Sequence, residues 1–170
     1  MIQTEQFIKY MKMCENAGLY AGDEGKIVHE SPEGGLETVG YGHKLNVLEK
    51  QTQQIYGWNI AELTREQCDY ILALDIESRA NSLAQIVPAW DKRSQREKEM
   101  LVEFQFNLGN VEKKFPKFYN AVLARDLSTQ RAEYKRHYKD PKGNKKELTR
   151  RNRLFYARYL SPLAIKGWSE

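Results

Sequence analysis

The sequence predicts a mostly helical α+β fold, in which a small N-terminal lobe with a β-hairpin is joined by a long helix to a helical C-terminal lobe. Glycines concentrate in residues 18–43, which predicts turns and short strands there. A long apolar stripe with helical spacing follows over about residues 64–87, and shorter stripes fill the rest of the chain. With 170 residues, 41% hydrophobic and 29% charged, the chain has the composition of one soluble domain, residues 1–170.

The N-terminal part is expected to form a short helix and then a hairpin. Side chains of an apolar stripe recur at every fourth position over residues 5–16, which predicts an amphipathic helix. The stripe contains Phe7, Met11 and Glu15. The glycine-rich segment after it has β-compatible pieces at 26–29 and 36–41. These predict a hairpin or small meander within a first lobe of about residues 16–62.

Helices are expected in the remainder of the chain. Thr64 and Gln67 form a capping box at the start of the helix over about 64–87. At 1.5 Å per residue this helix would be about 33 Å long, enough to connect two lobes. Further helices are predicted at 93–108, 118–123, 128–138 and 149–159, with a basic turn at 141–144. We expect the helix over 5–16 to pack on a second lobe of about residues 88–170.

Several classes of protein are excluded by composition and motifs. The net charge of +4 favours anionic surfaces without selecting one. The N-terminus lacks a secretory signal and no apolar run reaches the roughly 18 residues of a membrane span, so we expect cytoplasmic synthesis and no membrane insertion. Cys14 and Cys68 are expected to be free thiols. The histidines, His29, His43 and His137, lack a zinc-binding spacing, and there is no G-x-S-x-G nucleophile elbow, so no metal or other cofactor is expected.

Glu15 is the carboxylate whose position best suits catalysis. It continues the apolar stripe, so its side chain is expected to point inward. It also lies in the last helical turn, where the negative end of the helix dipole opposes a further negative charge. Burial and the dipole both raise the pKa of such a carboxyl, which suits a general acid at neutral pH. An ordinary solvated glutamate at a helix end is the alternative.

The segment Thr38-Val39-Gly40-Tyr41-Gly42-His43 is a tight strand end with a hydroxyl before it and an imidazole after it. It is not a dinucleotide-binding loop, because a third glycine and a strand–helix–strand frame are missing. The alternative is a hairpin corner, where the two glycines permit close backbone packing and the histidine braces the hairpin.

Glu15, the glycine-rich hairpin and the motif at 38–43 together resemble the active-site signature of phage-type lysozymes, the T-even endolysin group of glycoside hydrolase family twenty-four. Later segments resemble the C-terminal lobe of that family in the same order. They are Leu63–Gln67, Phe104–Gly109, Phe115–Phe118, Leu123–Asp126, Leu148–Arg151 and Gly167-Trp168. The resemblance covers nearly the whole chain and implies a lysozyme-like fold.

The resemblance implies a muramidase that cuts the β-1,4 bond between N-acetylmuramic acid and N-acetylglucosamine, as a bacteriolytic endolysin. Glu15 takes the place of the glutamate that protonates the leaving oxygen, and Thr38 matches the threonine that helps to place the attacking water. The hairpin aspartate of the family is replaced here by Ser31, with Glu30 beside it. Glu24 stays an alternative acid, because a Glu-Gly pair often follows the first helix in this family.

The second catalytic group stays open between several candidates. An inverting glycosidase needs two carboxyl groups about 6.5–9.5 Å apart, and Glu30, Glu33 and Glu37 are the available hairpin carboxylates. Glu30 reaches the cleft only if a bulge or the following turn redirects it. A hydroxyl pair, Ser31 with Thr38, is the other arrangement that would hold the water.

The resemblance also suggests residues that bind substrate. They are Tyr41, His43, Phe106, Asn107 and Arg150, and Arg150 or Arg151 is a candidate partner for Glu15. A structural role is the alternative for each: a braced hairpin for His43, and helix packing before Gly109 for Phe106 and Asn107.

Two further functions are compatible with the sequence. A lytic transglycosylase would need one acid/base glutamate only, because a hydroxyl of the sugar itself attacks. A non-catalytic module that binds nucleic acid or the cell envelope is the alternative from another class, because residues 135–153 are strongly basic with interleaved aromatic residues. Our prediction is the muramidase, acting on peptidoglycan as a monomer, with no nucleic-acid partner. It would reach the cell wall either through a holin or by carriage in a phage particle.

Overall fold

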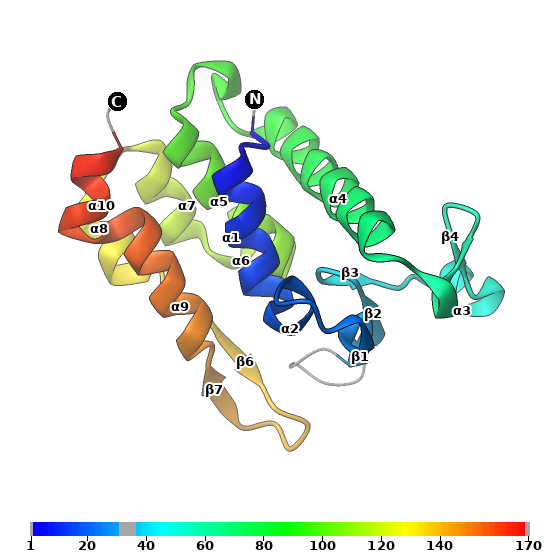
Figure 1. The fold of residues 1–170 in the computed structure, drawn as a ribbon. Helices are drawn as coiled ribbons and strands as arrows, with labels where there is room; N and C mark the ends of the chain where they lie inside the picture. The colour runs from blue at the N-terminus through cyan, green and yellow to red at the C-terminus, as the bar shows by residue number, and fades with distance from the viewer. Residues whose placement is uncertain (1, 31–36, 169–170) are drawn as a thin grey trace. The chain divides into compact units, whose positions relative to one another are not determined.

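The computed structural model describes residues 2–30 and 37–168 and divides the chain into two compact units (Figure 1). The hairpin unit consists of Gln3–Asp75 with Lys139–Lys145. The helical unit consists mainly of Ile76–Tyr138 and Lys146–Glu170. The fold is α+β and mostly helical, as predicted. The packing of residues 5–16 on the second lobe stays a prediction.

The hairpin unit begins with the predicted amphipathic helix, α1 (Glu5–Glu15). Thr4 caps this helix by accepting a hydrogen bond from the backbone N–H of Phe7 at 3.2 Å. The apolar face of α1 is buried, through Phe7, Tyr10 and Met11. A short helix, α2 (Ala17–Tyr20), and a 3-10 turn, η1 (Glu24–Lys26), follow it.

The glycine-rich segment forms an antiparallel sheet, as predicted. Its strands are β1 (Val28–Glu30), β2 (Glu37–Val39) and β3 (His43–Lys44), in the order β1-β2-β3. Gly40 and Gly42 adopt φ angles of +58° and +81°, which glycine reaches without steric cost. A Cβ at Gly40 would lie 3.2 Å from Cys68 Cβ and Sγ, so glycine also permits the close approach of the sheet to α4.

A second hairpin, which the sequence reasoning missed, lies between this sheet and the long helix. It follows α3 (Val47–Thr52) and consists of β4 (Gln54–Ile55) and β5 (Trp58–Asn59), followed by η2 (Ile60–Glu62). The long helix α4 (Arg65–Ile86) matches the prediction. Both bonds of its capping box are present, at 2.9 and 3.2 Å between Thr64 and Gln67.

The helical unit contains most of the predicted helices. They are α5 (Gln95–Leu108), α6 (Val111–Lys114), α7 (Pro116–Leu123), α8 (Leu127–Glu133), α9 (Thr149–Phe155) and α10 (Pro162–Gly167), with a 3-10 turn at Trp90–Lys92 and a π-helical stretch at Tyr156–Leu160. The core centres on Phe104, whose ring stacks on Phe118 with 4.1 Å between centroids. Phe155 packs edge-on against Phe104 at 5.2 Å.

The helix predicted over 128–138 is too long, because α8 ends at Glu133. Residues His137–Lys139 form β6, which pairs with β7 (Lys145–Glu147) across the predicted basic turn. The chain does not continue the helix to Arg136, because both backbone groups of Arg136 bind the side chain of Asn152. Its N–H donates to Asn152 Oδ1 at 3.0 Å, and its carbonyl accepts from Asn152 Nδ2 at 3.0 Å.

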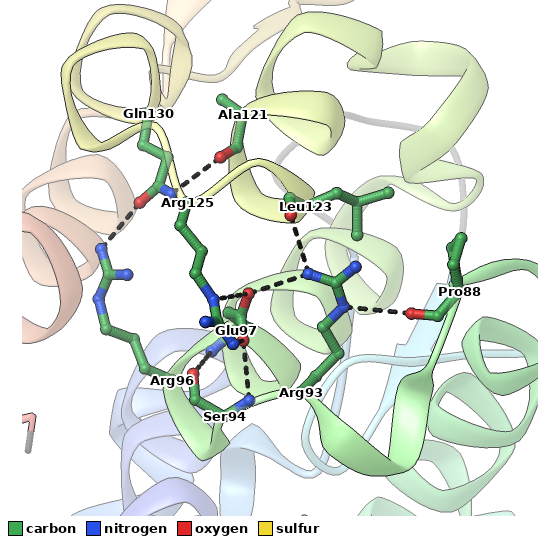
Figure 2. Close-up of polar contacts among 9 residues, drawn as sticks. All are labelled: Pro88, Arg93, Ser94, Arg96, Glu97, Ala121, Leu123, Arg125 and Gln130. Carbon is green, nitrogen blue, oxygen red and sulfur yellow. Dashed lines mark hydrogen bonds and ion pairs between the residues drawn. The ribbon is translucent and has the colours of Figure 1, made fainter. Parts of the chain in front are cut away.

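A polar cluster around Glu97 fixes the start of α5 (Figure 2). Ser94 and Glu97 form a capping box, in which Ser94 N–H donates to Glu97 Oε2 at 2.8 Å. Arg93 and Arg125 donate to Glu97 Oε1 at 3.1 and 3.3 Å. Burial raises the pKa of Glu97, but these donors together outweigh it, so the net pKa is lowered. Because Arg93 also donates to the carbonyl of Leu123 at 2.9 Å, the cluster joins α5 to the end of α7.

Candidate active site

Glu15 is the last residue of α1, and its side chain is directed into the protein. The side chain is half-buried and its Oε1 atom is inaccessible to solvent. The apolar stripe predicted this inward orientation. A carboxyl group in such a position lies at the C-terminal end of the helix dipole, where the charged form is disfavoured.

Asn16 connects the end of α1 to the sheet. Its Nδ2 donates to the carbonyl of Lys26 at 2.7 Å and to that of Gly40 at 2.9 Å. Its Oδ1 accepts from Leu19 N–H at 3.2 Å and so caps α2. The sequence reasoning missed this residue, although an asparagine directly after a helix is a recognisable cap signal.

Thr38 lies in the middle strand β2, where it is 3% exposed. It is opposite His29 in β1 and Lys44 in β3. Gly40, two residues further on, is the residue that accepts from Asn16. The structure therefore joins the segments that carry Glu15 and Thr38 through one side-chain amide.

The other hairpin carboxylates differ in what surrounds them. Glu24 is exposed at the start of η1, where Asp23 caps the turn by accepting from Gly25 N–H at 3.0 Å. The backbone of Glu30 pairs with Glu37 at the ends of β1 and β2. Ser31 and Glu33 lie outside the described residues.

The motif residues Tyr41 and His43 are held by the hairpin unit itself. Tyr41 is 2% exposed, and Lys12 Nζ lies 5.4 Å from the centroid of its ring. His43 Nδ1 lies 2.9 Å from Asp75 Oδ2, and its Nε2 lies 3.0 Å from Glu49 Oε2. Burial lowers the pKa of His43, but the hydrogen bonds and charges of the two carboxylates outweigh it and raise the pKa overall. These contacts match the bracing role that the sequence left as an alternative for His43.

Phe106, Asn107 and Arg150 belong to the helical unit. Phe106 is 8% exposed, with the guanidinium of Arg79 at 5.9 Å from its ring centroid. Asn107 Oδ1 accepts a hydrogen bond from Arg136 Nη1 at 3.2 Å. Arg150 is exposed in the first turn of α9. Phe106 is thus buried, and Asn107 is half-buried and hydrogen-bonded, within the helical unit.

A buried cluster of charged side chains contacts Asn107. Arg136 Nη1 and Arg151 Nε each donate to Glu103 at 2.6 Å, and the side chains of Arg136 and Glu103 are fully buried. Arg136 also lies 4.1 Å from the ring centroid of Phe104. Arg136 and Arg151 belong to the basic stretch that suggested nucleic-acid binding, yet they are inside the protein and neutralise a carboxylate. That stretch therefore presents less positive charge to a partner than its composition indicates.

The described cysteines and histidines were also candidates for metal binding and nucleophilic catalysis. Among them no group of three or more histidine, cysteine, aspartate or glutamate side chains could hold a metal ion. Cys68 is a buried free thiol, and burial raises its pKa to about 11. A thiol with this pKa stays protonated at neutral pH and is a poor nucleophile. No helix in residues 2–30 and 37–168 is long and apolar enough to span a membrane.

The chain is similar to known proteins in family and in fold. The family model of phage lysozymes matches residues 22–153. Among solved structures, the muramidase domain of SpmX from Asticaccaulis excentricus is similar, with a TM-score of 0.57 and 17% sequence identity. The match covers 94% of this chain and 97% of that domain, and at this identity it shows the fold. A search of the curated proteins found no match.

Proposed function

This chain belongs to the phage lysozyme family, and we propose that Glu15 and Thr38 carry its reaction. The protein is a lysozyme-type glycoside hydrolase, a muramidase whose substrate is bacterial peptidoglycan. One observation carries the assignment of residues: a helix-end carboxyl with a buried oxygen is tied, through Asn16, to the strand that bears Thr38.

In the proposed reaction Glu15 is the general acid. It donates its proton to the glycosidic oxygen as the bond from that oxygen to C1 of the N-acetylmuramic acid unit breaks. A water molecule oriented by the Thr38 hydroxyl then adds to C1 and loses a proton to a neighbouring base. Glu30 is the candidate base for this proton. In the alternative arrangement the hydroxyls of Ser31 and Thr38 only hold the water, and its proton passes to the solvent.

The remaining candidate residues are an alternative acid, Glu24, and the residues proposed to support or contact the glycan. Glu24 is exposed at the start of η1, whereas one carboxyl oxygen of Glu15 is buried, and this difference favours Glu15 as the acid. Tyr41 and His43 are proposed to hold the hairpin in place for glycan binding. Phe106, Asn107 and Arg150 are also proposed to contact the glycan, as the family resemblance implies.

Product analysis tests the assignment of the acid. We would digest purified peptidoglycan with the native protein and with the Glu15→Gln and Glu24→Gln variants, and identify the products by mass spectrometry. The expected products have reducing muramic ends, and they are lost in Glu15→Gln but kept in Glu24→Gln. The reverse pattern would move the acid to Glu24, and anhydro-muramic ends would identify a lytic transglycosylase. Unchanged far-UV circular dichroism of both variants is the control for folding.

We further propose that the enzyme is an endolysin, made in the host cytoplasm and active on the cell wall as a monomer after a holin has opened the membrane. Expression in a bacterial host tests this role. Lysis is expected only when a holin is expressed together with the enzyme. Lysis at the same time without a holin would contradict the proposed route of release, and sedimentation velocity would show whether the protein is a monomer.

A further inference from the structure

Three aromatic side chains gather on the surface of the hairpin unit, at the β4–β5 hairpin and the facing side of α4. Tyr56 and Tyr70 are 56% and 52% exposed. The ring of Trp58 lies 5.6 Å from that of Tyr70 and 6.3 Å from that of Tyr56, in edge-to-face contact. We call these three residues the aromatic cluster.

The backbone at Tyr56 is strained. Tyr56 and Gly57 occupy the turn between β4 and β5 with φ angles of 52° and 81°. A turn of this kind favours asparagine or glycine at both positions, because a side chain at positive φ meets the backbone. Left-handed conformations are unfavourable for an ordinary residue, and they concentrate at functional sites. The turn therefore keeps an exposed tyrosine at a position where asparagine would fit better.

A pocket of about 400 Å³ opens next to the aromatic cluster, within the range of about 300–1,000 Å³ that is usual for ligand sites. Its lining residues are His43, Asn46, Leu48, Glu49, Thr52, Gln54, Ile55, Tyr56 and Gly57. Among residues 2–30 and 37–168, the side-chain amide of Gln54 and the Nδ2 of Asn46 make no hydrogen bond, so both are available to a ligand. Tyr56 belongs to both the pocket and the cluster.

The charges of the pocket select between the units of a glycan strand. The charged side chains in the lining, Glu49 and His43, are paired with each other at 3.0 Å. Asp75 lies on the other nitrogen of His43 at 2.9 Å, so the site has a slight negative excess. Such a site disfavours the N-acetylmuramic acid unit, whose lactyl group carries a stem peptide with free carboxylates, and accepts the neutral N-acetylglucosamine. Exposed aromatic rings suit sugars, because the C–H groups on one face of a pyranose pack against them.

We propose that the aromatic cluster and this pocket form a second glycan-binding site, which holds an N-acetylglucosamine unit of the substrate strand and contains neither Glu15 nor Thr38. The proposal rests on the glycan-cleaving function proposed above. Tyr56 provides a ring face, while the amides of Asn46 and Gln54 face the hydroxyl and acetamido groups of the sugar. A second contact on the same polymer raises the affinity for long strands through effective concentration.

An NMR titration tests the second site directly. We would titrate the ¹⁵N-labelled Glu15→Gln variant with the β-1,4-linked tetramer of N-acetylglucosamine. The indole N–H of Trp58 and the amides of Gln54–Gly57 are expected to shift as binding saturates. If these resonances stay fixed while others shift, the second site is wrong. A wrong assignment of the acid appears separately, as peptidoglycan cleavage by Glu15→Gln.

Substitutions at Tyr56 separate binding from folding. Asparagine suits the positive φ, so Tyr56→Asn is expected to keep the native unfolding temperature. Its affinity for the N-acetylglucosamine tetramer, measured from the shift of the Trp58 indole N–H, is expected to fall about threefold to tenfold. Tyr56→Phe keeps the ring and is expected to retain most of the affinity. Tyr20→Ala, which removes another exposed tyrosine of the hairpin unit, is the matched control. Equal affinity of Tyr56→Asn and Tyr20→Ala would overturn the proposal.

Discussion

Replacing Glu103 by glutamine tests the buried charge cluster of the helical unit. Glu103 is fully buried, and both Arg136 and Arg151 donate to it at 2.6 Å. Glutamine has nearly the same shape but no charge, so the variant leaves the guanidinium of Arg136 buried without its carboxylate. Removing one partner of a buried ion pair costs about 3–5 kcal/mol. In a chain of this size about 1 kcal/mol corresponds to about 2–4 °C, so the unfolding temperature should fall by about 6–20 °C.

The pH dependence of the same variant gives a second test. Burial raises the pKa of Glu103, but the charges of Arg136 and Arg151 outweigh it and lower the pKa below its ordinary value of 4.5. A lowered pKa means that the ion pair stabilises the fold above pH 4.5, and that this stability is lost as the pH falls through the native pKa. The difference in unfolding temperature between native protein and variant should therefore be large at pH 7 and should shrink in acid.

Calorimetry over this pH range would measure the effect. Glu112→Gln makes the same chemical change at an exposed position of α6, and there the free energy of unfolding should change by less than about 0.5 kcal/mol. Equal unfolding temperatures for Glu103→Gln and Glu112→Gln, or a difference that does not vary with pH, would refute the reasoning. Because Arg136 also donates to Asn107, the amide resonance of Asn107 is expected to shift in Glu103→Gln only.

Three further changes test the hairpin unit. The raised pKa of His43 means that its ion pairs stabilise the fold below pH 6.5 and are lost as the pH rises through the native pKa, so His43→Gln should abolish a fall in unfolding temperature measured between pH 6 and 9. Gly40→Ala places a Cβ 3.2 Å from Cys68 at a φ of +58°, and should lower the free energy of unfolding by at least about 1 kcal/mol in urea denaturation. Asn16→Ala loses the bonds that tie the Glu15 segment to the sheet, so kcat on peptidoglycan should fall more than KM rises. Asn16→Asp can still accept the bond that caps α2 but cannot donate to the sheet, so it should not recover kcat. An Asn16→Ala enzyme with native kcat would contradict the positioning role.

Most helices were predictable because their signals are local. The capping box of Thr64 and Gln67 and the apolar stripe over 5–16 involve residues three or four positions apart, which any isolated stretch of chain displays. The end of α8 was not predictable, because the backbone of Arg136 binds Asn152, sixteen residues away. The β4–β5 hairpin was missed because its turn contains a tyrosine where asparagine or glycine is the usual signal.

In the candidate site, too, the features with local sequence signals were predictable and those that depend on long-range contacts were not. Sequence spacing predicted that Glu15 ends a helix with an inward side chain and that the motif 38–43 ends a strand, and the structure agrees on both points. The bridge through Asn16 and the bracing of His43 by Asp75, thirty-two residues away, depend on tertiary contacts. Neither contact leaves a pattern along the chain.

By itself the sequence determined the fold class, the family and a short set of candidate residues, since residue type, periodicity and capping are properties of neighbouring positions. Only the tertiary structure decided which charges lie inside. Arg136 and Arg151 look like surface charges in the sequence, yet they surround Glu103 from positions 33 and 48 residues away. The physical reason is that burial of a charge depends on a partner brought close by folding, and the cost of desolvation is met only when that partner is in place.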